Sequence, residues 1–403
     1  MKKSMIVAAM LAMVATGANA KSATDSATIA KNKPVFTVVK QNPITSIKDQ
    51  NRSGTCWAYS TLSYFESEIL KHTGKTYDLS EMFVANKTYM DRATMAVRMH
   101  GDVSFSEGGS AYDVLYALQH YGIVPEGAMP APGTLTGDSL ANFGEFFNVM
   151  TPYVEAVAKS NAKKISSAWK SGLQGIIDSY IGKTPEKFTY QGKQYTPQSF
   201  CQSLGLNLDD YVTITSYTHH PMWSKFAVEV QDNWRWPLSY NVPMDDLCKI
   251  IDNAINNGYT IAWGGDVTED GFTRKGLGIA YDVKKVRSMA GTDADRWFKL
   301  SKDEKKEKFD SLGVNAPEVV PTQAMRQEAF DNWETTDDHG MHIYGIAKDQ
   351  NGKEYYMVKN SWGEYGDYKG TWYMTKAFVA YKTMDFMVNK NAIPKDIRKK
   401  LGI

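Results

Sequence analysis

Apolar side chains recur at helical spacing in two neighbouring stretches near the start of the chain. Leu62, Phe65 and Ile69 lie three to four positions apart, and the run ends in basic residues followed by Gly74. Basic residues and a glycine are typical of a helix C-terminus. A second helical run follows Ser80, and a serine directly before an acidic residue is typical of an N-cap. The pattern therefore predicts two consecutive helices.

Short segments rich in β-branched and aromatic residues predict strands. They are Phe36–Lys40, Tyr211–Thr215, Thr260–Val267, His342–Ala347, Tyr355–Lys359 and Gly370–Thr375. An Asn351-Gly352 pair separates the fourth segment from the fifth, and Asn-Gly is a strong signal for a hairpin turn. The last three segments are therefore predicted to form an antiparallel meander.

The middle of the chain is mainly helical in pattern. From about Gly137 to Gln202 apolar residues recur at helical spacing, and Met244 to Asn257 repeats the pattern. Residues 301–332 are charged and also have a helical pattern. We therefore expect a large helical insertion at about residues 137–240.

The first twenty residues have the pattern of a secretory signal. Lys2 and Lys3 precede an apolar run that ends near Thr16, and Ala18-Asn19-Ala20 has the form of an A-x-A cleavage site. The run is shorter than the about 20 residues that span a bilayer, which disfavours a membrane anchor. We expect a signal peptide over 1–20, cleavage after Ala20, a flexible polar leader over 21–35, and a secreted or periplasmic protein.

Charge and length narrow the class of protein. The chain has 46 basic and 45 acidic residues, and removal of the signal would leave a net charge of about −1. Such a balance gives no excess of positive charge that would indicate binding to nucleic acid or to anionic lipid. The remaining roughly 380 residues exceed a typical single domain, so we expect two lobes or a core with a large insertion.

Three cysteines in an exported chain leave one without a partner. Cys56 is the natural candidate for the unpaired thiol. Cys201 and Cys248 are expected either to be joined in a disulfide or to be buried free thiols. Cys248 lies on the apolar side of a helical pattern, which favours the free thiols.

Cys56 stands where a glycine-containing loop turns into the first predicted helix. Unpaired backbone N–H groups and the positive end of the helix dipole lower the pKa of a thiol at such a position. A nucleophilic cysteine also needs a base, a group that orients the base, and donors for an oxyanion. Late in the chain, His339 and the run Asn360-Ser361-Trp362-Gly363 supply residues of these types.

These motifs together resemble the papain-like cysteine peptidases. Gln50 lies six positions before Cys56, His339 has Gly345 six positions after it, and Asn360 opens the Asn-Ser-Trp-Gly signature. The resemblance implies that Gln50 donates to the oxyanion, that Asn360 orients the imidazole of His339, and that Trp362 shields their hydrogen bond. Trp57, beside the cysteine, is assigned a supporting role.

The glycine pair Gly108-Gly109 is a candidate substrate contact, because glycines let extended substrate backbone lie against protein backbone. In the papain-like clan the matching pair lines the pocket for the second residue on the acyl side. The alternative is that the two glycines serve only as an entry to the following helix.

The other histidines are not expected to form a site. His342 is an alternative to His339, but three positions along a strand place it on the opposite face. The remaining ones, His72, His100, His120, His219 and His220, lack partners at ligand spacing. We therefore expect neither a metal nor another cofactor.

Within the clan the chain resembles the bleomycin hydrolase and aminopeptidase C family. The segments that carry this resemblance are Asn42–Ser46, Leu79–Glu81, Glu107–Gly109, Tyr121–Pro125, Trp263–Val267 and His339–Met341. The family implies an α+β, two-lobed, papain-like fold over residues 36–403, with a helical lobe, an antiparallel β lobe and a large helical insertion. It also implies hydrolysis of peptides from the amino end, and often a homohexameric ring.

Two features differ from the family pattern. The family is usually cytoplasmic, whereas this chain carries an export signal. The family's C-terminal arm, which restricts the cleft to aminopeptidase action, extends beyond the position of Ile403. An endopeptidase or a dipeptidyl peptidase is therefore an alternative function.

The sequence thus predicts a thiol peptidase in which the Cys56 thiolate, paired with the His339 imidazolium, attacks a peptide carbonyl. His339 then protonates the leaving amine, and the Gln50 side-chain amide with the Cys56 N–H holds the oxyanion. An inactive papain-fold binding protein is an alternative from another class, which the intact set of four residues disfavours. A transglutaminase-like enzyme is disfavoured because that group generally orients its histidine with aspartate.

Overall fold

The computed structural model describes residues 33–132, 140–285, 301, 304, 309 and 311–403. The predicted signal peptide at 1–20 and most of the predicted leader at 21–35 lie outside these residues. The chain divides into two compact units, and the larger one comprises residues 38–279, 320–347 and 354–403. All of the predicted site residues belong to the larger unit.

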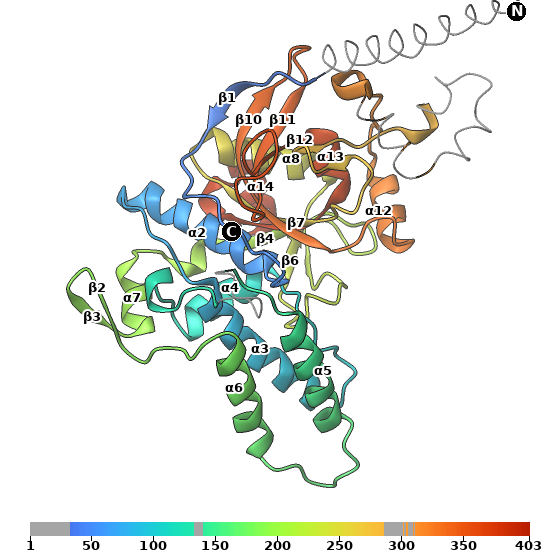
Figure 1. The fold of residues 1–403 in the computed structure, drawn as a ribbon. Helices are drawn as coiled ribbons and strands as arrows, with labels where there is room; N and C mark the ends of the chain where they lie inside the picture. The colour runs from blue at the N-terminus through green and yellow to red at the C-terminus, as the bar shows by residue number, and fades with distance from the viewer. Residues whose placement is uncertain (1–32, 133–139, 286–300, 302–303, 305–308, 310) are drawn as a thin grey trace, which may run out of the picture. The chain divides into compact units, whose positions relative to one another are not determined.

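The two predicted N-terminal helices are confirmed as α2 (Cys56–Thr73) and α3 (Glu81–Arg98). Gly74 caps α2 in the left-handed conformation with φ of 69°, which glycine adopts without a steric penalty. The hydroxyl of Ser80 accepts from the Phe83 N–H and caps α3. Helix α4 (Ala111–His120) follows the glycine pair (Figure 1).

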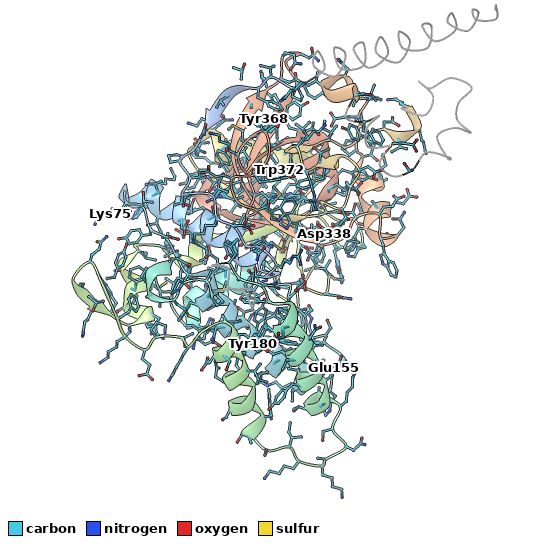
Figure 2. The ribbon with its side chains drawn as sticks, in the orientation of Figure 1. Lys75, Glu155, Tyr180, Asp338, Tyr368 and Trp372 are labelled. Atoms are coloured by element: carbon cyan, nitrogen blue, oxygen red, sulfur yellow. The ribbon has the colours of Figure 1, made fainter. Side chains whose placement is uncertain are left out.

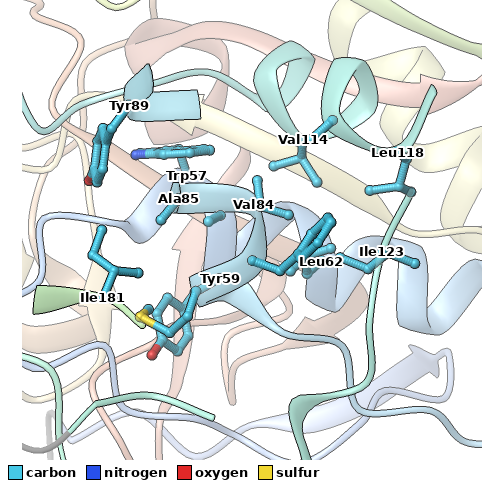
Figure 3. Packing of buried hydrophobic residues seen from close by; sticks show 14 of the residues in the cluster. Trp57, Tyr59, Leu62, Val84, Ala85, Tyr89, Val114, Leu118, Ile123 and Ile181 are labelled. Atoms are coloured by element: carbon cyan, nitrogen blue, oxygen red, sulfur yellow. The ribbon is translucent and has the colours of Figure 1, made fainter. Parts of the chain in front are cut away.

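Helix α2 forms the centre of the main hydrophobic core. Leu62, Phe65 and Ile69 are each completely buried. The helix packs against α3 and α4 and against strand β7 (Ile261–Gly265). Figure 3 shows Leu62 among apolar side chains from the neighbouring helices. Every side chain from position 57 to position 69 of α2 is buried, so the stability of the helix depends on the elements that cover it on all sides.

The predicted insertion is helical in its first part. Its helices are α5 (Gly144–Ala158), α6 (Ala168–Tyr180) and α7 (Pro197–Ser203). Helices α5 and α6 lie side by side, as Glu155 and Tyr180 illustrate (Figure 2). The expectation of an all-helical stretch is wrong at residues 188–195, where β2 (Phe188–Tyr190) and β3 (Lys193–Tyr195) form a hairpin. Gln191 and Gly192 both have positive φ in its turn, and the aromatic side chains of the strands pack on Phe200.

One large sheet forms the β lobe. Besides β7, its strands are β1 (Thr37–Gln41), β4 (Tyr211–Thr215), β5 (Lys225–Phe226), β6 (Ser239–Asn241), β8 (Phe272–Thr273), β9 (Leu277–Gly278), β10 (His339–Lys348), β11 (Glu354–Lys359), β12 (Thr371–Thr375) and β13 (Thr383–Asn389). Their order is β5-β6-β4-β13-β7-β10-β11-β12-β9-β8, with β1 on β10. The predicted meander is confirmed as β10, β11 and β12. Strand β13, which the sequence analysis missed, lies between β4 and β7.

Further helices and 3-10 turns lie between and after these strands. They are α8 (Met244–Asn256), α12 (Gln323–Asp331), α13 (Lys376–Lys382) and α14 (Lys395–Leu401), with 3-10 turns η1 (Glu126–Ala128), η2 (Leu208–Asp210), η4 (Gly313–Asn315) and η5 (Lys390–Ala392). Much of the predicted helical segment at 301–332 lies outside the described residues. No helix of the described residues is long and apolar enough to cross a membrane. Cys56, Cys201 and Cys248 are all free, so the disulfide alternative is wrong.

A buried carboxyl group lies where α2 meets the sheet. Glu68 is 5% exposed, and its Oε2 accepts hydrogen bonds from Asn389 Nδ2 at 3.1 Å and from the Tyr211 hydroxyl at 3.4 Å. Burial raises the pKa of Glu68 from 4.5 to about 7, against the lowering effect of these bonds. A folded-state pKa above the unfolded value means that the ionised group costs stability.

We predict that Glu68→Gln stabilises the protein at pH 8 but not at pH 4.5. The cost of the ionised carboxylate is absent below the unfolded pKa, grows between pH 4.5 and 7, and reaches about 3 kcal/mol above pH 7. Urea unfolding at both pH values measures the difference. Glu155→Gln, at an exposed position of α5, is the control. A Glu68→Gln effect that is equal at both pH values would contradict this origin of the cost.

Candidate active site

The loop before α2 presents Cys56 at the start of the helix, as predicted. Gly54 has φ of 66°, a conformation that favours glycine, and Thr55 occupies the N-cap position. Cys56 is therefore the first residue of α2. The thiol lines a cleft of about 420 Å³ in the larger unit.

Strand β10 reaches this end of α2 because residue 340 is a glycine. A Cβ on Gly340 would lie 2.7 Å from Ser60 Oγ and 3.3 Å from Trp57 Cα. Any larger residue would push the strand away from the helix. The close contact places His339, at the start of β10, in the cleft that Cys56 lines.

Asn360 orients the imidazole of His339. Asn360 Oδ1 accepts from the Ser361 N–H at 2.8 Å and lies 2.9 Å from His339 Nε2. Because that oxygen is an acceptor, Nε2 carries the proton and Nδ1 is left as the basic nitrogen. Asn360 is 1% exposed and His339 is 7% exposed. The ring of Trp362 lies 5.0 Å from the His339 ring, where it covers the pair.

His342, the alternative base, faces another part of the molecule. Its Nδ1 lies 2.9 Å from Ser63 Oγ on α2, and its side chain is completely buried. His342 does not line the cleft, whereas His339 does. The opposite faces of the strand thus separate the two histidines, as the alternation predicted.

Gln50 lines the cleft with its amide nitrogen free to donate. Gln50 Oε1 accepts from the Ser361 hydroxyl at 2.6 Å, and the Gln50 N–H donates to Ser361 O at 2.8 Å. This anchor fixes the orientation of the amide, so Nε2 is the end that can donate to a substrate oxygen. Sequence reasoning missed this role of Ser361, although the residue is part of the Asn-Ser-Trp-Gly motif.

The glycine pair is sterically required by its surroundings and also lines the cleft. A Cβ on Gly108 would lie 1.9 Å from the Asp232 carboxylate, and one on Gly109 would lie 2.8 Å from the Trp57 ring. Trp57 is held by a hydrogen bond from Nε1 to Glu107 O at 3.1 Å. Tight packing therefore explains in part why both positions are glycine. The contact of the two glycines with substrate stays a prediction.

Five carboxylates line the cleft, and the sequence analysis did not identify them. They are Glu107, Asp232, Asp337, Asp338 and Asp385. No lysine or arginine is among the described residues of the lining. Figure 2 marks Asp338 next to the start of β10. Glu107 precedes the predicted glycine pair, and Asp337 and Asp338 precede His339, so these three adjoin predicted site residues in the sequence. Asp232 and Asp385 come from segments that no sequence pattern connected with the site.

Burial and mutual repulsion raise the pKa values of these acids. Burial raises the pKa of Asp385 to about 6 and of Asp338 to about 7. Burial, followed by repulsion from Asp232 and Asp385, raises the pKa of Asp337 well above its usual range. A cation that enters this part of the cleft would relieve the repulsion.

Opposing effects act on the pKa of the Cys56 thiol, and the lowering expected at the start of a helix stays a prediction. Burial raises the pKa of Cys56 to about 12, and Asp232 and Asp337 add to the effect; hydrogen bonds from the backbone of Gly340 and Trp57 oppose it. Burial also lowers the pKa of His339 to about 4. Both groups therefore favour their neutral forms, and a nearby base is needed when the sulfur reacts.

One group of possible metal ligands lies outside the cleft. His219 Nε2 and His220 Nε2 lie 3.0 Å and 2.9 Å from the Glu229 carboxylate. The expectation that these histidines lack partners at ligand spacing is therefore wrong. The sequence analysis did not predict this group, because Glu229 lies close to the two histidines only through the turn of the chain after β4.

Comparisons with known proteins agree with the fold. The Peptidase C1-like family matches residues 2–402. Aminopeptidase C of Lactobacillus helveticus is 23% identical over 90% of this chain and 85% of its own length, and bleomycin hydrolase of Rattus norvegicus is 21% identical over 92% and 86%. The crystal structure of PepW from Lactobacillus rhamnosis has a TM-score of 0.67 at 19% identity, with 96% of this chain and 92% of that chain covered.

The match over nearly the whole sequence confirms the papain-like fold and the predicted kinship with aminopeptidase C and bleomycin hydrolase. The chain belongs to the Peptidase C1-like family and is a cysteine-type peptidase.

Proposed function

We propose that this peptidase hydrolyses oligopeptides from the amino end through a thioester on Cys56. The observation that carries the proposal is the acidic cleft that contains Cys56, His339 and Gln50 together. The hydrogen bond from His339 to Asn360 supports the role of His339, because it leaves Nδ1 as the basic nitrogen of the ring.

In the first half of the reaction the Cys56 sulfur attacks the peptide carbonyl carbon while His339 Nδ1 accepts the thiol proton. The Gln50 amide and the Cys56 N–H donate to the oxyanion, where each such donor typically contributes about 10²–10³ in turnover. The tetrahedral intermediate collapses with cleavage of the C–N bond, and His339 gives its proton to the departing amine.

In the second half His339 accepts a proton from water as the water attacks the thioester. Collapse breaks the C–S bond, releases the carboxylic acid and returns the proton to Cys56. Asn360 keeps the ring orientation through both halves.

The charge of the cleft supports recognition of a free amino end. A substrate's α-ammonium brings one positive charge into a site lined by five carboxylates. Within the described part of the chain, Asp337 has neither a hydrogen-bonding partner nor an ion-pair partner. Asp232 is already paired with Arg92 at 3.1 Å. The Glu107 side chain also has no such partner among the described residues, but Asp337 lies two residues before His339 and its charge acts on the Cys56 thiol. We therefore take Asp337 as the carboxylate that accepts the ammonium. The names of the relatives, which include several aminopeptidases, agree.

A matched pair of peptides, one with a free amine and one N-acetylated, tests this proposal. We predict that acetylation lowers kcat/KM by about 10- to 100-fold, because a charge-assisted hydrogen bond is typically worth 1.5–3 kcal/mol. Mass spectrometry should show release of single N-terminal residues. Equal cleavage of both peptides would contradict amino-end recognition and would indicate an endopeptidase, and release of dipeptides would indicate a dipeptidyl peptidase.

Variants sharpen the same experiment. Asp337→Asn should reduce kcat/KM for the free-amine peptide and leave kcat/KM for the acetylated peptide unchanged. The ratio of the first kcat/KM to the second should therefore fall towards one. Asp270→Asn removes an equal charge from an exposed position outside the cleft and should leave the ratio unchanged.

We further propose that the protein is exported, on the evidence of the signal pattern that ends at Ala20. Mass spectrometry of the protein purified from its native cells should give Lys21 as the first residue. Retention of Met1 would contradict export through this signal. The homohexameric assembly implied by the resemblance stays a prediction.

A further inference from the structure

Two adjacent histidines and a glutamate converge outside the cleft. His219 and His220 follow strand β4, and Glu229 follows β5. One nitrogen from each imidazole and a carboxylate oxygen all lie within 4.8 Å of one another. Ligands at about 2.0–2.1 Å around a tetrahedral Zn²⁺ are about 3.3 Å apart, so only small side-chain movements would separate these atoms to that distance.

The two rings are held in place by aromatic neighbours. His220 stacks on Phe226 with ring centroids 4.2 Å apart, and His219 stacks on Phe330 at 5.7 Å. Asn241 Nδ2 donates to the backbone carbonyl of His220 at 3.0 Å and fixes the loop. The ligand atoms therefore need little further ordering, which is the main entropic cost of assembling a site from loops.

Gln327 on α12 provides support behind His219. Its Oε1 accepts from the Thr218 N–H at 2.5 Å and lies 3.3 Å from His219 Nδ1, and its Nε2 lies 3.1 Å from the same nitrogen. Gln327 Nε2 also donates to Asp331 Oδ1 at 2.9 Å. The Gln327 amide oxygen can thus accept a hydrogen bond from the Nδ1–H of His219 when Nε2 of that histidine binds a metal. Metal-ligating histidines almost always donate their other N–H to such a partner.

We propose that His219 Nε2, His220 Nε2 and the Glu229 carboxylate bind a divalent transition metal of the Zn²⁺ class, with water as a further ligand. Two imidazoles and one carboxylate form a donor set that Zn²⁺ prefers over hard cations such as Mg²⁺ and Ca²⁺. The partial exposure of all three side chains leaves the metal an entry path.

The site has a consequence for the cleft. Gln231 and Asp232, which line the cleft, directly follow the segment that carries Glu229. A metal bound to Glu229 ties this segment to the loop after β4, and through Gln327 to α12. The metal therefore has a structural role that restricts the wall of the substrate cleft.

Metal titration of the full mature chain with a Cys56→Ala substitution and without a polyhistidine tag tests the proposal. The substitution removes the proposed catalytic thiol, which also binds zinc, so the result is independent of the proposed peptidase mechanism. Calorimetric titration with Zn²⁺ should show one equivalent bound. Co²⁺ should give the visible absorption of a tetrahedral or five-coordinate nitrogen and oxygen site, and Zn²⁺ should raise Tm.

Variants on the Cys56→Ala background assign the ligands. His220→Ala and Glu229→Gln should each weaken Zn²⁺ binding by more than about tenfold, and Gln327→Ala by about tenfold, the usual range for a supporting partner. His120→Ala removes an exposed histidine elsewhere and should not change the affinity. Glu229→Gln preserves shape, so it serves if an alanine variant is unstable. An absence of saturable binding, or an affinity unchanged by both ligand variants, would overturn the proposal.

Discussion

The contact between strand β10 and the first turn of α2 is the constraint on which the site depends. It exists only because residue 340 has no Cβ, since a methyl group there would meet Ser60 Oγ at 2.7 Å. The contact joins the helical lobe to the β lobe at the position where Cys56 begins its helix and His339 begins its strand. Asn360 then falls beside His339, because β11 returns antiparallel to β10 and ends next to it.

The same close packing determines the electrostatics of the cleft. Burial favours the neutral thiol of Cys56 and the neutral imidazole of His339, and the nearby carboxylates make a free thiolate still less favourable. In the proposed mechanism the sulfur therefore depends on His339 to take its proton during the attack. The acidic lining that disfavours the thiolate would also attract the cationic amino end of the proposed substrate, so the same charges would affect both the reactivity of Cys56 and the choice of substrate.

Local signals in the sequence predicted much of the fold. Patterns that extend over only a few residues predicted helix α2 with its Gly74 cap, the Ser80 cap of α3, and the meander from β10 to β12. The hairpin at 188–195 was not predicted, because Gln191-Gly192 is a weaker sequence signal for a hairpin turn than Asn-Gly. The Ser361 anchor, the acids from distant segments and the pairing of Glu229 with His219 depend on tertiary contacts, which no local pattern encodes.

The rate at which iodoacetamide alkylates Cys56 at pH 7, followed by mass spectrometry, tests the dependence of the sulfur on His339 most directly. Cys56 should react faster than Cys201 and Cys248, because His339 lines the same cleft as Cys56 and can take its proton, whereas neither of the other two thiols lines that cleft. In His339→Ala the rate should fall by at least about tenfold, because an isolated buried thiol has little thiolate at this pH. His120→Ala should leave the rate unchanged. A Cys56 rate that is the same in the wild-type protein and in His339→Ala would contradict the account.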